Sequence, residues 1–168
     1  PAYAVYAPAT ATWSKWKTLN LPDEPKFWFT GAGSIQRLDL PGGDILLPVS
    51  IMPNPKHKQR STTVLRCRFD GQNLKYIEQG NEMTRNVERG FYEPSLTRFK
   101  DRYYLTLRND EHGYIAVGDD GLNYEPPRRW QFLCGVFFGP PHFLCRAPDL
   151  ALAKQPSYRN QQTRCVLW

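Results

Sequence analysis

Glu93 and Arg108 are of residue types that could do chemistry. A carboxylate can accept a proton from a neighbouring group, and the planar fork of an arginine pairs bidentately with a carboxylate. Each residue also has a purely local explanation. Glu93 is equally consistent with an ordinary surface residue that precedes Pro94 and has no chemical role. Arg108 is equally consistent with a local ion pair to Asp110 or Glu111. On the residues alone, both interpretations stay open.

Three of the four cysteines, Cys134, Cys145 and Cys165, lie in residues 133–168, and they suggest metal ligands only by their number. They do not form a paired C-x-x-C motif, and His142 is the imidazole nearest to them. We therefore predict no metal site, and we expect no cofactor. Four cysteines in 168 residues also do not indicate a disulfide scaffold.

The formal net charge of +6 does not indicate a nucleic-acid partner. Half of it lies in residues 133–168, and the remaining chain is nearly balanced. The one local basic cluster, residues 56–60, is smaller than the basic patch expected of a phosphate-binding surface. We interpret it as a solvated loop.

The length of 168 residues suits one domain with a substantial core. No stretch approaches the ~18 consecutive apolar residues of a membrane span. No signal-peptide pattern is visible at the start. A chain that begins at Pro1 is expected to be processed or to be a piece of something longer.

The elements that must position Glu93 and Arg108 are short strands. Apolar runs rich in β-branched and aromatic residues, typical of a half-buried pleated surface, occur at residues 45–49, 63–65, 103–107 and 114–117. Turn sequences separate them at residues 41–44, 70–71, 100–101 and 120–121. The sequence therefore predicts an all-β chain of antiparallel strands.

The order of strands and turns repeats once along the chain. Leu38 corresponds to Leu96, and Gly71 corresponds to Gly121. A unit of ~50 residues with about four strands is typical of a β-propeller blade, and propellers contain 4–8 blades. We therefore predict an incomplete β-propeller of about two to three four-stranded antiparallel blades over residues 1–132.

Residues 133–168 do not continue this pattern. They show neither a period of 2 nor a period of 3.6, so we predict an irregular C-terminal tail. Two interpretations are open: a divergent closing segment, or residues foreign to the fold, as a shifted reading frame would produce.

Residues 117–124 have the form of an Asp-box, a hairpin turn of the pattern D-x-G followed by an aromatic residue. Asp119 is expected to accept hydrogen bonds from its own turn, Gly121 to supply a positive φ, and Tyr124 to fill the core. A weaker copy contains Asp70 and Gly71. We assign these residues a structural role and expect Asp119→Ala to destabilise the fold.

Residues 92–130 resemble one blade of the sialidase (neuraminidase) superfamily of six-bladed propellers, and the resemblance extends over about residues 31–132. It implies that Glu93 is the carboxylate that polarises a tyrosine nucleophile. It implies that Arg108 is one of three arginines that hold the carboxylate of an acidic sugar. A tyrosine nucleophile avoids the like-charge repulsion that an Asp or Glu would meet at such a sugar. The family also implies a secreted or periplasmic location.

The chain departs from the family pattern in several places. The Asp-box begins Val117-Gly118-Asp119, without the usual hydroxyl residue. Ser34-Ile35-Gln36 lacks the arginine that opens the first blade. The nucleophilic tyrosine, the acid/base aspartate and the remaining arginines have no assignment. We expect this chain to be inactive alone.

The predicted function is that of a fragment or truncated form of a sialidase-like glycoside hydrolase acting on terminal acidic sugars. One alternative is a non-catalytic β-propeller that binds a glycan or protein, with Trp28 and Tyr92 as candidate platforms. Another is a propeller glycosidase that uses a carboxylate pair.

Overall fold

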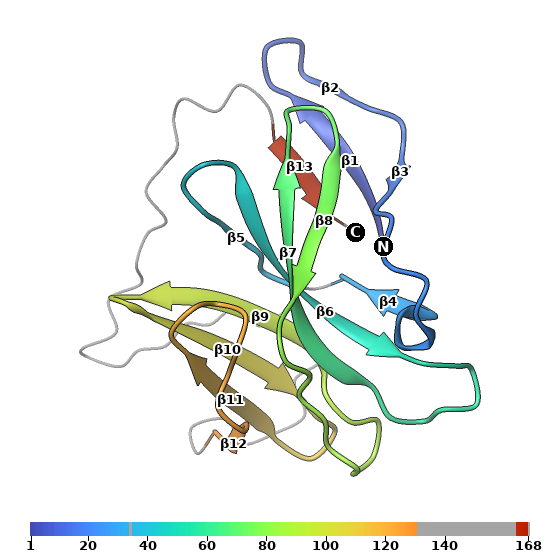
Figure 1. The fold of residues 1–168 in the computed structure, drawn as a ribbon, viewed down its shortest axis with the longest axis vertical. Coiled ribbons are helices and arrows are strands. Elements are labelled where there is room, and N and C mark those ends of the chain that lie inside the picture. Colours follow the sequence, from blue (N-terminus) through green and yellow to red (C-terminus); the bar gives the residue numbers. More distant parts are fainter. Residues whose placement is uncertain (34, 131–163, 168) are drawn as a thin grey trace.

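The computed structural model describes residues 1–33, 35–130 and 164–167, whose strands form three antiparallel sheets (Figure 1). We call them the N-terminal, middle and third sheets. None of them closes on itself. The prediction of an all-β chain is confirmed. No helix in the described part of the chain has the length and apolar character needed to cross a membrane.

The N-terminal sheet contains β1 (Ala2–Ala7), β2 (Thr12–Trp13), β3 (Lys17–Thr18) and β13 (Arg164–Leu167). The middle sheet contains β4 (Phe29–Gly31), β5 (Leu38–Asp39), β6 (Asp44–Met52), β7 (Ser61–Phe69) and β8 (Leu74–Gln79). The third sheet contains β9 (Tyr92–Phe99), β10 (Arg102–Arg108), β11 (Gly113–Gly118) and β12 (Arg128–Arg129). A 3-10 turn, η1 (Pro25–Phe27), precedes β4.

Strand β6 is buried on both faces. Four of its residues share a core cluster with Tyr3 and Val5 of β1: Ile45, Leu47, Val49 and Ile51. Leu46 belongs to a second cluster, with Leu105 of β10. Because successive side chains of a strand point to opposite faces, β6 packs against the N-terminal sheet on one side and the third sheet on the other. Residues 45–49 were expected on a half-buried surface but are buried throughout, because a second sheet covers the face that was expected to be exposed.

Strand β10 shows the period of 2 that its sequence predicts. Tyr103, Leu105 and Leu107 are buried in the cluster against the middle sheet. Arg102 is exposed, and Arg108 is half-buried at the other end of the strand. By this alternation, Arg108 lies on the face of the third sheet that points away from the buried leucines.

The two predicted hairpin turns share one geometry. Oδ1 of Asp70 accepts hydrogen bonds from the backbone N–H groups two and three positions further on, at 3.0 and 2.7 Å. Oδ1 of Asp120 does the same at 2.8 and 2.7 Å. Gly71 and Gly121 have φ angles of +96° and +79°, in the left-handed region that favours glycine. The backbone hydrogen bonds, followed by the Lys75 ammonium, lower the pKa of Asp70 to about 2.

Asp119 is not the carboxylate of the second turn, contrary to the expectation from the D-x-G pattern. Its side chain is 82% exposed and pairs with Arg102 at 3.0 Å. Asp120 directly precedes Gly121, as Asp70 precedes Gly71, and only from this position does the side chain reach its own turn. Tyr124 is buried in the core, and its hydroxyl donates to the carbonyl of Gly121 at 3.0 Å.

Each turn is held by the sheet that precedes it in the sequence. The backbone N–H of Leu74, at the end of the first turn, donates to the hydroxyl of Tyr3 in the N-terminal sheet at 2.9 Å. The backbone N–H of Tyr124 donates to Oδ1 of Asn81, just after the middle sheet, at 2.9 Å. Nδ2 of Asn81 donates back to the carbonyl of Tyr124 at 2.9 Å. Polar contacts therefore join successive sheets at equivalent positions.

Within residues 133–168, the structure describes only β13, which pairs antiparallel with β1. Cys165 lies in this strand. Cys134, Cys145 and His142 lie outside the described residues, as does most of the tail predicted to be irregular.

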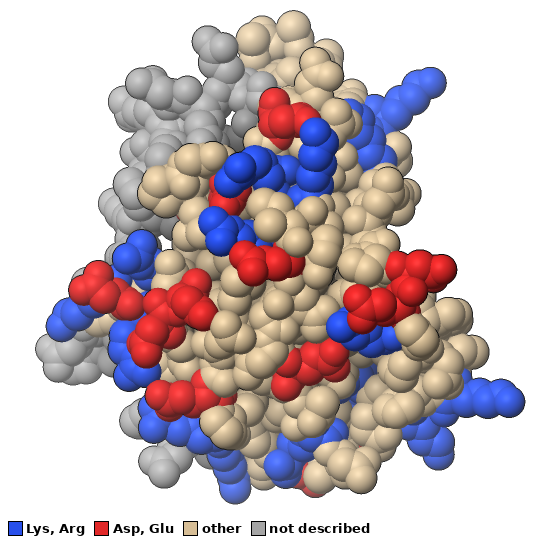
Figure 2. Space-filling view, viewed as in Figure 1, with Lys and Arg blue, Asp and Glu red and all other residues tan. Residues whose placement is uncertain are grey.

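Charged side chains of both signs are interspersed over the face shown in Figure 2. One cluster combines buried Asp44 with Arg66 and Arg68, whose guanidinium groups contact its carboxylate at 2.6 Å each. The Arg68 hydrogen bond and the Arg66 hydrogen bond lower the pKa of Asp44 against the effect of burial. These basic residues therefore neutralise an internal acid.

Candidate functional site

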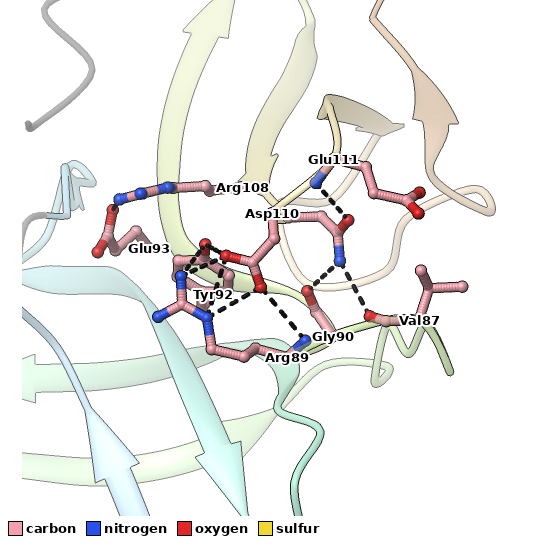
Figure 3. A network of polar contacts seen from close by, with 9 residues as sticks. Val87, Arg89, Gly90, Tyr92, Glu93, Arg108, Asp110 and Glu111 are labelled. Carbon is pink, nitrogen blue, oxygen red and sulfur yellow. Dashed lines mark hydrogen bonds and ion pairs between the residues drawn. The ribbon is translucent and has the colours of Figure 1, made fainter. Parts of the chain in front are cut away.

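Glu93 and Arg108 lie together at one edge of the third sheet (Figure 3). Nη1 of Arg108 donates to Oε2 of Glu93 at 2.7 Å. The two side chains are 22% and 30% exposed, for Arg108 and Glu93 respectively. The structure thus brings together the two residues singled out in the sequence, in a place that an external ligand can reach.

A β-bulge in β9 explains this meeting. Ser95 pairs with Thr106, but the next registered pair is Tyr92 with Arg108, so Glu93 is part of an extra step in β9. Glu93 has a φ of +49°, in the left-handed region that non-glycine residues rarely adopt. Bulges of this kind re-aim side chains. Two successive residues of β9, Tyr92 and Glu93, therefore both contact Arg108, which a regular strand would not allow.

A second ion pair adjoins the first. The guanidinium of Arg89 faces the carboxylate of Asp110, with Nε at 2.9 Å from Oδ2 and Nη2 in contact with Oδ1. Nη2 of Arg89 also donates to the hydroxyl of Tyr92 at 2.7 Å, and that hydroxyl donates to Oδ1 of Asp110 at 2.8 Å. Arg89, Tyr92 and Asp110 form a closed triangle of polar contacts.

Tyr92 connects the two ion pairs. The guanidinium carbons of Arg89 and Arg108 lie 4.5 and 5.1 Å from the centre of its ring, within the range of cation–π attraction. Tyr92 is 1% exposed, so it is not the surface platform that the binding-module alternative requires of it. A ring buried to this extent has no open face for a sugar.

The charges in this group set the protonation of its members. Burial, followed by the hydrogen bond to Asp110, raises the pKa of Tyr92 to about 12. The Arg89 guanidinium holds the pKa of the Asp110 carboxyl well below its usual range, although burial opposes this effect. Tyr92 is therefore a neutral hydrogen-bond donor at pH 7, and Asp110 is an anion. A neutral, buried phenol is not an activated nucleophile.

Asn109 fixes the turn that carries Asp110. Its side chain is buried, and Nδ2 donates to the carbonyl of Gly90 at 2.8 Å and to that of Val87 at 3.1 Å. Its Oδ1 accepts the backbone N–H of Glu111 at 3.1 Å. The turn after β10 is thereby tied to the segment before β9, which holds Asp110 opposite Arg89.

The pairing of Arg89 with Asp110 was not predicted from the sequence, in which Asp110 or Glu111 was the expected partner of Arg108. The structure gives Asp110 to Arg89, and Glu111 lies 3.7 Å from Arg85. A signal was present. The start of one strand and the end of the next lie at the same edge of an antiparallel hairpin, so charges just before β9 and just after β10 are brought near one another, although the hairpin alone does not decide which of them pair.

No metal site is found among the described residues, in which no group of three or more His, Cys, Asp or Glu side chains converges. The polar group at the sheet edge instead has two guanidinium groups, two carboxylates and a phenol. Such a set can bind an acidic ligand by exchange of carboxylates at an arginine.

No family model, curated protein or solved structure matches this chain. The assignment of a function therefore rests on the residues and their geometry, together with the resemblance seen in the sequence.

Proposed function

We propose that the three sheets are blades of an incomplete, sialidase-like β-propeller, and that Arg108 binds the carboxylate of a terminal acidic sugar. The observation that carries this proposal is the contact of Arg108 with Glu93 at 2.7 Å. These are the two residues that match the family pattern, and they meet at an accessible sheet edge.

The arrangement of the sheets supports the propeller. The N-terminal, middle and third sheets follow one another in the sequence and share two core clusters through the middle sheet. The first strand of the third sheet, β9, runs parallel to the segment of Gln36, where the carbonyl of Gln36 accepts the N–H of Leu96 at 3.0 Å. Neighbouring inner strands of a propeller are expected to lie side by side in this way.

The proposed chemistry divides between this chain and the remainder of a propeller. Arg108 would pair its fork with the sugar carboxylate. Glu93 would accept a proton from a tyrosine nucleophile, as the resemblance implies. Tyr92 does not fit that nucleophile, because its phenol is buried and held by Arg89 and Asp110. The chain alone is expected to bind the acidic sugar without hydrolysing it.

The test is a calorimetric titration of the 168-residue chain with N-acetylneuraminic acid, and with galactose as the uncharged comparison. A hydrogen bond to a charged group contributes about 1.5–3 kcal/mol, so Arg108→Ala should weaken binding of the acid at least about tenfold. Arg98→Ala is the matched control, because Arg98 lies on the same sheet and pairs with exposed Asp101. Equal affinity of wild type and Arg108→Ala would overturn the proposal.

A second candidate function, a glycan-binding module without catalysis, is favoured by the exposed Trp28. Its side chain is 57% exposed beside η1, and tryptophan faces are suitable stacking surfaces for sugars. Titration of tryptophan fluorescence with neutral oligosaccharides tests it. Binding that is lost in Trp28→Ala and retained in Arg108→Ala would favour this candidate over the first.

A further inference from the structure

The ligand-free protein already has a carboxylate at Arg108, supplied by its own Glu93. We propose that Glu93 is an internal substitute for the ligand carboxylate and makes Arg108 selective for ligands that carry such a group. This inference rests on the proposed function, because it takes Arg108 as the site of ligand binding.

Among the described residues, Glu93 is the carboxylate in contact with Arg108. Asp110, the nearest alternative in the sequence, is engaged by both prongs of Arg89 and by the Tyr92 hydroxyl. Arg108 also contacts the Tyr92 ring, at 5.1 Å from its centre, but a neutral ring leaves the charge uncompensated. The charge of Arg108 is therefore balanced by Glu93.

The contact of Glu93 with Arg108 is held by fewer interactions than that of Asp110 with Arg89. The φ of +49° at Glu93 is unfavourable for a residue with a Cβ, and Pro94 after it restricts the backbone further. By contrast, Asp110 sits in a turn fixed by buried Asn109. Of the two ion pairs, the one that includes Glu93 has the fewer hydrogen bonds and the less favourable backbone.

Exchange of carboxylates would explain selectivity. A neutral sugar that displaced Glu93 would leave the half-buried guanidinium of Arg108 without a counterion, and this penalty discriminates against it. An acidic sugar replaces the lost charge with its own. The displaced Glu93 then has free lone pairs with which to accept a hydrogen bond from a hydroxyl group, so ligand binding also makes this carboxylate available.

Glu93→Gln tests the inference, because glutamine keeps the shape of glutamate and removes the competing charge. We expect the variant to bind N-acetylneuraminic acid about tenfold more tightly than wild type in calorimetry. The methyl ester of the same sugar has no charge to exchange, so its affinity for Glu93→Gln should exceed its affinity for wild type by less than about threefold. Glu125→Gln is the matched control, because Glu125 forms an exposed ion pair with Arg102 on the same sheet.

The outcomes separate this inference from the proposed function. Unchanged or weaker binding in Glu93→Gln, with binding that still depends on Arg108, would overturn the inference and leave the proposed function standing. Binding that does not respond to Arg108→Ala, or no binding by any variant, would overturn both. Glu93→Asp provides a second variant should Glu93→Gln unfold. Its side chain is shorter by one methylene and reaches Arg108 less well, so this variant should also bind the acidic sugar more tightly than wild type does.

Discussion

The hydroxyl of Tyr92 donates a hydrogen bond of 2.8 Å to Oδ1 of Asp110, which joins the first residue of β9 to the turn after β10. Arg89 contacts both residues and closes the triangle. The phenol is thus kept protonated beside a carboxylate that is kept ionised. Tyr92 contacts the guanidinium groups of both Arg89 and Arg108 at the sheet edge, and Asp110 contacts that of Arg89.

Tyr92 should make the fold sensitive to alkali. Its pKa of about 12 in the folded chain lies above the value of about 10 in an unfolded chain. The protonated Tyr92 phenol therefore contributes its full stabilisation of the folded state below about pH 10, and this contribution is lost as the pH rises toward 12. Between pH 9 and 11, the unfolding free energy of wild type should fall by about 1 kcal/mol more than that of Tyr92→Phe. Urea denaturation at each pH measures this, with Tyr104→Phe as the control. Parallel pH profiles for wild type and Tyr92→Phe would contradict it.

The second hairpin turn should depend on Asp120 and not on Asp119. Asp120→Ala removes the acceptor of two backbone N–H groups and should lower the unfolding free energy by about 1 kcal/mol. Asp119→Ala breaks only an exposed ion pair and should change it by less than about 0.5 kcal/mol. Denaturation midpoints of the two variants decide the matter. A larger loss in Asp119→Ala would restore the assignment expected from the D-x-G pattern.

Asn81 should contribute to stability although it lies in a connecting segment. Asn81→Ala leaves the N–H and the carbonyl of buried Tyr124 without their partner, at a cost of about 1–2 kcal/mol. Hydrogen exchange at the Tyr124 amide should accelerate accordingly. Asn54→Ala serves as the comparison, because Asn54 caps an exposed loop through the N–H of Lys56. Equal effects of the two substitutions would argue against a role for Asn81 between the sheets.

The strands could be predicted from the sequence because their pattern is local. The alternation in residues 103–107 and the Asp-Gly pairs at 70–71 and 120–121 depend on neighbours only. The burial of β6 on both faces follows from an apolar run without alternation, but only once both flanking sheets are known. The pairing of β13 with β1 joins segments far apart in the sequence, and no local signal indicates it.

The candidate site could be predicted in part. Glu93 and Arg108 were singled out through the family resemblance, and the structure places them in contact. The partner of Asp110 could not be deduced from spacing, because it depends on the bulge that shifts Tyr92 opposite Arg108. A shift of one residue changes which side chains meet across a ladder. Only the register distinguishes Arg89 from Arg108 as the partner.

The contacts that hold the two Asp-Gly turns have a consequence for how such a chain can lengthen. In both, the residue that follows the turn reaches back to the sheet before it, to Tyr3 in one case and to Asn81 in the other. A duplicated unit would therefore bring its own attachment point to its predecessor. Growth by tandem duplication would need no separately evolved interface, only a preceding sheet that presents one polar side chain at the matching place.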